Sequence, residues 1–170
     1  MIRWKGQTLL SAVAWPTLAI AILSSPVAAQ NATELVGTWS LVSSVTERDG
    51  VITDQFGVGA KGMLVLDSTG HFMLTIIGPD LPKFSSNNRA SGTPDENKAV
   101  VSKSIAMIGD YSMSASDRTL TFKVNSATFP NWNGTEQKRL LSALKGDVLK
   151  YVTPTASSGG IGTVTWRRVK

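Results

Sequence analysis

The side chains best able to do chemistry in this sequence lie close together in its second half. Gln137 and Arg139 are two residues apart, so on a β-strand they point to the same side. If that side faces the interior, Arg139 is a buried cation that requires an acid, a carbonyl oxygen or the anionic end of a ligand. If it faces outward, Arg139 is an ordinary solvated residue. The sequence leaves both orientations open.

Aromatic and imidazole side chains add further candidate ligand contacts. Trp132 lies in a segment rich in turn residues just before Gln137. Tyr111 and Tyr151 are candidates to line the same cavity, with core packing as the alternative for both. His71 could serve as a base or a pocket donor, although a position at the start of a strand favours an exposed side chain.

Several classes of chemistry are excluded or weakly supported. The chain has no cysteine and one histidine, which rules out thiolate metal sites, disulfides and sites needing two imidazoles. The Gly-x-Gly-x-x-Gly match at 57–62 precedes a predicted strand rather than the helix of a dinucleotide site. The basic residues are scattered, whereas nucleic-acid binding requires a basic patch. We therefore expect no metal, no cofactor and no nucleic-acid partner.

The first 29 residues have the pattern of a secretory signal peptide. Two basic residues precede an apolar run at 9–23, and small residues follow it up to Ala29. This run contains Pro16 and is shorter than the roughly 20 apolar residues of a membrane-spanning helix. We expect cleavage after Ala29, a single domain at 30–170 without stable membrane insertion, and a periplasmic or secreted location.

The remainder of the chain alternates short strand patterns with turn signals. Such a meander predicts a mainly β fold, a closed antiparallel up-and-down barrel of eight or nine strands, because closure removes exposed edges. One helix is expected mid-chain in the stretch 96–108, since Pro94 followed by the acidic residues Asp95 and Glu96 favours a helix start. The expected strands are 35–46, 51–56, 62–66, 71–77, 111–114, 119–124, 135–141, 148–153 and 163–169.

The two ends of the predicted meander carry residues suited to closing it. Trp39 alternates with Leu41 and Val45, so the three are expected on one face of the first strand. Arg168 shares a face of the last strand with Trp166. A guanidinium stacked on the indole of Trp39 would contribute about 0.5–2 kcal/mol and join the two ends. We read Trp39, Trp166 and Arg168 as barrel-closing residues.

The strand at 71–77 carries apolar residues on both of its faces, which predicts burial on both sides. The mid-chain helix could then cover the outer face of this strand or plug the mouth of the barrel.

An ordered set of motifs resembles the bacterial and fungal lipocalin-like domain family. The set comprises Gly37-Thr38-Trp39, the segment Phe-Pro-Asn-Trp-x-Gly-Thr-x-Gln-x-Arg at 129–139, and Trp166-Arg167-Arg168. The resemblance covers nearly all of residues 34–170 and implies a barrel of generally unassigned function, here in a secreted bacterial member. The chain departs from true lipocalins in lacking disulfides and in its mid-chain helix, so ligand binding is implied by fold analogy.

Three functional classes follow. The first is a binding module that holds a small apolar or amphipathic molecule, with Arg139, Gln137 or a tyrosine at its polar end. The second is a metal-free isomerase or cyclase that uses His71 or Tyr111 for proton transfer in the same pocket. The third is a structural or partner-binding barrel with a filled interior. A ligand pocket of about 300–1,000 Å³ would separate the first class from the third.

Overall fold

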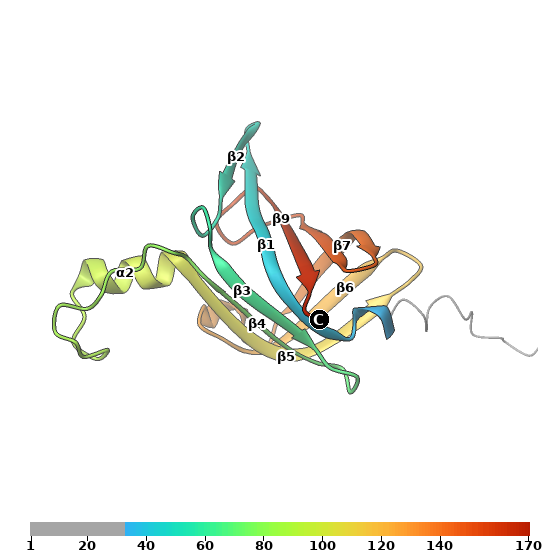
Figure 1. Ribbon diagram of the computed structural model, residues 1–170, viewed down its shortest axis with the longest axis horizontal. Helices are drawn as coiled ribbons and strands as arrows, with labels where there is room; N and C mark the ends of the chain where they lie inside the picture. Colours follow the sequence, from blue (N-terminus) through green and yellow to red (C-terminus); the bar gives the residue numbers. More distant parts are fainter. Residues whose placement is uncertain (1–32) are drawn as a thin grey trace, which may run out of the picture.

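Nine antiparallel strands dominate residues 33–170, the part of the chain that the computed structural model describes (Figure 1). The predicted signal peptide at 1–29 lies outside the described residues. The strands are β1 (Gly37–Arg48), β2 (Val51–Asp54), β3 (Lys61–Leu66), β4 (His71–Ile77), β5 (Ser104–Ser114), β6 (Thr119–Ala127), β7 (Glu136–Lys145), β8 (Val148–Thr153) and β9 (Ile161–Arg168). Helix α2 (Pro94–Lys103) and a single 3-10 turn, η1 (Pro130–Trp132), interrupt them.

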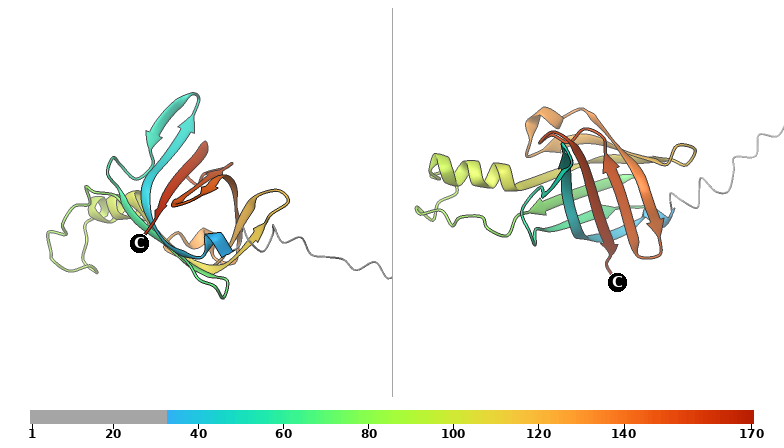
Figure 2. Two further views of the ribbon diagram at one scale, coloured as in Figure 1. Left: turned by 45° about the vertical axis from the view of Figure 1, so that its right-hand side comes forward. Right: turned by 90° about the horizontal axis from the view of Figure 1, so that it is seen from above.

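The predicted closed barrel is confirmed. Strand β1 pairs with β3, each strand from β3 to β8 pairs with the next, and β9 pairs back with β1 (Figure 2). Strand β2 is an extra strand that pairs only with the far end of β1, after a turn in which Asp49 and Gly50 have positive φ angles of 52° and 76°. Asp-Gly is favoured in such a two-residue hairpin because both positions need left-handed backbone.

The ends of the chain meet as predicted. Trp39 of β1 lies opposite Arg168 of β9, and the guanidinium carbon is 4.1 Å from the centre of the indole ring. Trp39 and Trp166 are both fully buried in one continuous apolar core. Together with the β1–β9 pairing, these residues close the sheet.

A β-bulge in β1 changes which of its residues face the barrel interior. Trp39 is buried, but the pairing register with β9 shifts between Leu41 and Ser43. The extra residue reverses the alternation, so that Ser44 is buried and Val45 is on the opposite face from Trp39. The prediction that Val45 shares the face of Trp39 was therefore wrong.

The predicted helix is correct only in its first part. Helix α2 ends at Lys103, and residues 104–108 belong to β5, where Ile105 pairs with Ile76 and Met107 with Leu74. Pairing with β4 places Ile105 and Met107 on the barrel interior, which a helical continuation would not do. The helix begins at Pro94, where the proline and the acidic first turn favoured a start. Thr93 accepts a hydrogen bond from Glu96 N, and the Glu96 carboxylate accepts one from Thr93 N at 2.8 Å.

The helix neither covers the outer face of β4 nor plugs the barrel. It has no buried residue and extends away from the barrel (Figure 1). Met73 and Ile77 on the outer face of β4 are 57% and 47% exposed, so the prediction that this strand is buried on both sides was also wrong. Within residues 33–170, no helix is long and apolar enough to cross a bilayer.

Candidate functional site

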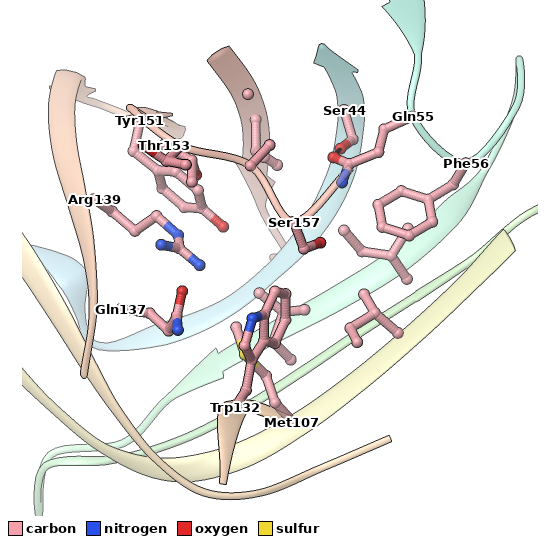
Figure 3. Close-up of a pocket in the computed structure, with 17 residues that line it drawn as sticks. Ser44, Gln55, Phe56, Met107, Trp132, Gln137, Arg139, Tyr151, Thr153 and Ser157 are labelled. Atoms are coloured by element: carbon pink, nitrogen blue, oxygen red, sulfur yellow. Dashed lines mark hydrogen bonds between the residues drawn. The ribbon is translucent and has the colours of Figure 1, made fainter. Parts of the chain in front are cut away.

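A cavity of about 250 Å³ opens at the end of the barrel where β4 ends and β5 begins (Figure 3). One wall is apolar and includes Phe56, Ile76, Met107 and Trp132. The opposite wall is polar, with Arg139, Gln137, Tyr151 and Thr153, and Ser44 and Gln55 lie further along the rim. The cavity therefore has an apolar side and a polar side, the arrangement that binds amphipathic molecules.

Strand β7 presents its predicted polar residues to the interior. Arg139 is only 6% exposed, and both Arg139 and Gln137 line the cavity. The orientation that the sequence left open is thus inward. In the pairing of β7 with β8, Leu141 lies opposite Tyr151, which places the phenol diagonally across from Arg139.

The surroundings of Arg139 do not neutralise its charge. Within residues 33–170 no carboxylate forms an ion pair with it, and its Nη1 donates to the neighbouring carbonyl of Lys138 at 3.0 Å. Its guanidinium carbon lies 5.9 Å from the ring centre of Phe122. Burial lowers the pKa of Arg139, and Tyr151 opposes this effect. A guanidinium nevertheless stays protonated in proteins, so the cavity carries a positive charge.

Tyr151 contributes a neutral phenol. Burial raises the pKa of Tyr151, while the neighbouring Arg139 lowers it to a smaller extent. Because burial is the larger effect, the hydroxyl keeps its proton at neutral pH and does not compensate the guanidinium. Its side chain lies beside the Arg139 guanidinium in the cavity (Figure 3).

The motif around Trp132 is a hydrogen-bonded unit that positions Gln137. Thr135 Oγ1 donates to the carbonyl of Trp132 at 2.8 Å and accepts from Gln137 Nε2 at 3.0 Å. Phe129 packs edge-to-face on Trp132, with ring centres 5.5 Å apart. This unit explains the spacing of the Trp-x-Gly-Thr-x-Gln segment, since Thr135 is held by the Trp132 carbonyl and in turn holds the Gln137 side chain.

Two further polar residues at the cavity were missed by sequence reasoning. Ser44 is turned inward by the bulge in β1, and its hydroxyl donates to Gln55 Oε1 at 3.2 Å. Gln55 in turn follows β2, and its backbone N–H donates to the Ser44 carbonyl at 3.0 Å. A bulge has no clear signature in a single sequence, so neither residue could be assigned to the interior.

A second, outer chamber of about 390 Å³ adjoins the cavity. The two share Gln55, Phe56, Ile105, Trp132 and Ser157 in their linings, so they lie side by side. The outer chamber adds side chains from the end of α2 and from the segment before η1, namely Val100, Val101, Ser102, Thr128 and Phe129. Its lining is mainly apolar.

Two predicted candidates lie elsewhere, which corrects their placement at the cavity. His71 begins β4 and points outward, with its Nδ1 3.7 Å from Asp110 Oδ1 and its side chain 67% exposed. Tyr111 lies further along β5, near the β3–β4 turn, where its hydroxyl donates to the Asp67 carbonyl at 2.7 Å. Because β4 and β5 run antiparallel, the start of β4, with His71, lies beside the later part of β5, with Tyr111. Both residues are therefore at the end of the barrel opposite to the cavity. Neither can touch a molecule held beside Arg139.

Within the described part of the chain, no group of three or more histidine and carboxylate side chains is arranged to hold a metal ion.

The chain is similar to several known proteins. The family described as "Lipocalin-like domain" matches residues 36–169. A curated relative from Aspergillus oryzae, named as a 4'-hydroxy-3'-methoxypropiophenone carrier protein, is 29% identical over 104 residues, which cover 55% of this chain and 93% of that protein. Among solved structures, a redesigned β-barrel aligns with 82% of this chain and 96% of its own, at 17% identity and a TM-score of 0.45.

Proposed function

Since the chain belongs to the lipocalin-like domain family, we propose that it binds a small apolar or amphipathic molecule inside its barrel. The observation that carries the proposal is the pair of adjoining chambers, of about 250 and 390 Å³, at the end of the barrel where Arg139 and Gln137 face the interior. Their volumes are of the order of known ligand pockets. A structural barrel with a filled interior would not leave this space.

The lining supports an amphipathic ligand. Phe56, Met107 and Trp132 offer apolar surface for the body of the molecule, and Arg139 and Gln137 offer donors for a polar end. The named function of the Aspergillus relative, a carrier of a small organic molecule, supports a carrier role. The signal-like pattern at 1–29 supports a periplasmic or secreted place of action.

The alternative function, a metal-free isomerase or cyclase, lacks its expected proton-transfer residues at the cavity. It required His71 or Tyr111 for proton transfer, and both lie at the end of the barrel away from the cavity. Carriage rather than catalysis is therefore the function that the site supports best.

A neutral fluorescent probe tests this proposal without reference to ligand charge. N-phenyl-1-naphthylamine fluoresces strongly in apolar cavities, and we expect saturable binding to the purified protein. Ser157 is exposed and lines both chambers, so Ser157→Trp should fill the passage and weaken probe binding by about tenfold or more.

The matched control is Ser116→Trp, which adds the same side chain at an exposed position in the β5–β6 turn. It should bind the probe like the wild type. Absence of saturable binding to the wild type, or equal binding by Ser157→Trp and the wild type, would refute the proposal.

A further inference from the structure

We infer that the ligand is a monoanion, a carboxylate or a comparably acidic group on an apolar body, and that its negative charge lies against Arg139. This inference rests on the proposed function and names the chemical class that the same cavity selects.

The first argument is charge balance. Arg139 is the single charged residue among those of the described chain that line the cavity, and it is only 6% exposed. A buried cation without a counter-ion is costly, and the cost is removed when an anion enters. One unbalanced positive charge matches one negative charge, which disfavours both cations and multiply charged anions.

The second argument is the unused donor capacity of the site. A guanidinium has five N–H donors. Within the described chain, one donor of Arg139 goes to the Lys138 carbonyl and a side-chain hydrogen bond joins Arg139 to Tyr151, which leaves further donors for a ligand. Arg139, Tyr151 and Gln137 converge on the same part of the cavity (Figure 3). Planar two-oxygen groups such as carboxylates suit this arrangement, because they accept two parallel hydrogen bonds from a guanidinium.

The third argument concerns how the guanidinium is held. Phe122, fully buried in the core, lies under it with 5.9 Å between the guanidinium carbon and the ring centre. The ring supports the cation from behind and offers no acceptor for its N–H groups. Arg139 is therefore held in place while its remaining donors are available to a ligand.

The remaining volume defines the rest of the molecule. The outer chamber adjoins the cavity at Trp132, and there Val100, Val101 and Phe129 contribute apolar side chains. A ligand with its acidic group at Arg139 can extend its apolar part through this passage. We therefore expect an elongated amphiphile with the acid at its inner end.

The test uses three probes that share a ten-carbon chain and differ in the end group: decanoate, 1-decanol and decylammonium. Calorimetric titration of the purified protein at neutral pH should give decanoate an affinity about tenfold or more above that of decanol, with decylammonium weakest. Arg139→Met should remove this preference by weakening decanoate about tenfold or more while leaving decanol nearly unchanged. Arg139→Lys, which keeps the charge, should retain part of the preference.

The matched control is Arg167→Met, which makes the same change of charge at an exposed position on β9. It should bind all three probes like the wild type, and circular dichroism verifies the fold of each variant. The wild-type comparison of the three end groups needs no variant, so it decides the inference even if a variant fails to fold.

Two outcomes with the wild-type protein would overturn the inference while leaving the proposed function intact. In one, decanol binds the wild type as tightly as decanoate. In the other, the neutral naphthylamine probe binds but decanoate does not. Equal weakening of decanoate and decanol by Arg139→Met would also overturn it, since the effect would then be on cavity shape. Failure of every probe, including the naphthylamine, would overturn the proposed function as well.

Discussion

The guanidinium carbon of Arg168 lies 4.1 Å from the centre of the indole ring of Trp39, across the β1–β9 pairing that closes the barrel. Arg168 also donates to the carbonyl of Val36 at 2.7 Å and to that of Glu34. Arg168, at the end of the last strand, thus stacks on the indole of Trp39 in the first strand. It also forms hydrogen bonds to the backbone that leads into that strand.

Arg168→Met should therefore destabilise the protein. Loss of the cation–π contact and of donors to two carbonyls should lower the free energy of unfolding by about 2–3 kcal/mol, measured by urea denaturation. Arg167→Met, on the exposed face of the same strand, should change it by less than about 0.5 kcal/mol. A loss at Arg168 no larger than that at Arg167 would show that the contact does not stabilise closure.

Gly37 offers an independent test of the same contact. Its φ of 144° lies outside the range that other residues favour, and an added Cβ would collide with Arg168 Nη1. Gly37→Ala should cost roughly 1–3 kcal/mol by strain and by displacement of the guanidinium. Because both changes act on one contact, the double variant Gly37→Ala/Arg168→Met should lose less than the sum of the single losses in urea denaturation. Full additivity would argue against a shared contact.

Arg139→Met should have the opposite effect on stability. In the unliganded protein, burial of the guanidinium costs free energy of desolvation, and no carboxylate among the described residues forms an ion pair that offsets this cost. A methionine of similar length should raise the free energy of unfolding by about 1–3 kcal/mol while it weakens decanoate. A clear loss of stability in the same urea experiment would indicate that Arg139 serves the fold rather than a ligand.

Trp132 should report ligand entry. It is half-buried at the junction of the two chambers, whereas Trp39 and Trp166, the other tryptophans of the described chain, are fully buried in the core. Decanoate should therefore change tryptophan emission in the wild type, and Trp132→Phe should abolish that change while reducing affinity by less than about tenfold. An emission change that persists in Trp132→Phe would place the bound probe elsewhere.

The β3–β4 turn should make stability depend on pH. The backbone N–H of His71, followed by the side chain of Thr69, holds the pKa of Asp67 below its ordinary value. A lowered pKa in the folded state means that Asp67 stabilises the protein above the ordinary carboxylate pKa and that this contribution is lost as pH falls through the folded-state pKa. Asp67→Asn should accordingly lower the melting temperature near neutral pH, and the difference from wild type should shrink in acid.

Asp80→Asn, in the loop between β4 and α2, is the control for that experiment. It should leave the melting temperature unchanged at every pH. A difference between Asp67→Asn and the wild type that stays constant down to low pH would contradict the assignment of this titration to Asp67.

Much of the fold could be predicted because it depends on local patterns. Turn residues such as Asp49-Gly50 mark hairpins, and alternation along each strand places Arg139 and Gln137 on one face. The pairing of Trp39 with Arg168 was predictable because closure of a meander brings the first and last strands together.

The features that could not be predicted depend on tertiary context. The bulge after Leu41 places Ser44 on the interior face instead of Val45. It arises from the β1–β9 register rather than from a residue type. Similarly, Ile105 is in a strand because β4 pairs with it, although the sequence before it continues a helical pattern. Tyr111 was assigned to the cavity because alternation gives the face of a strand but not the end of the barrel.

The most direct test of ligand binding inside the barrel is a crystal structure of the protein with decanoate. We expect the carboxylate within hydrogen-bonding distance of the Arg139 guanidinium, with the alkyl chain running past Trp132 into the outer chamber. Decanoate bound on the outer surface with an empty cavity, or bound inside with its carboxylate pointing to solvent, would contradict this account.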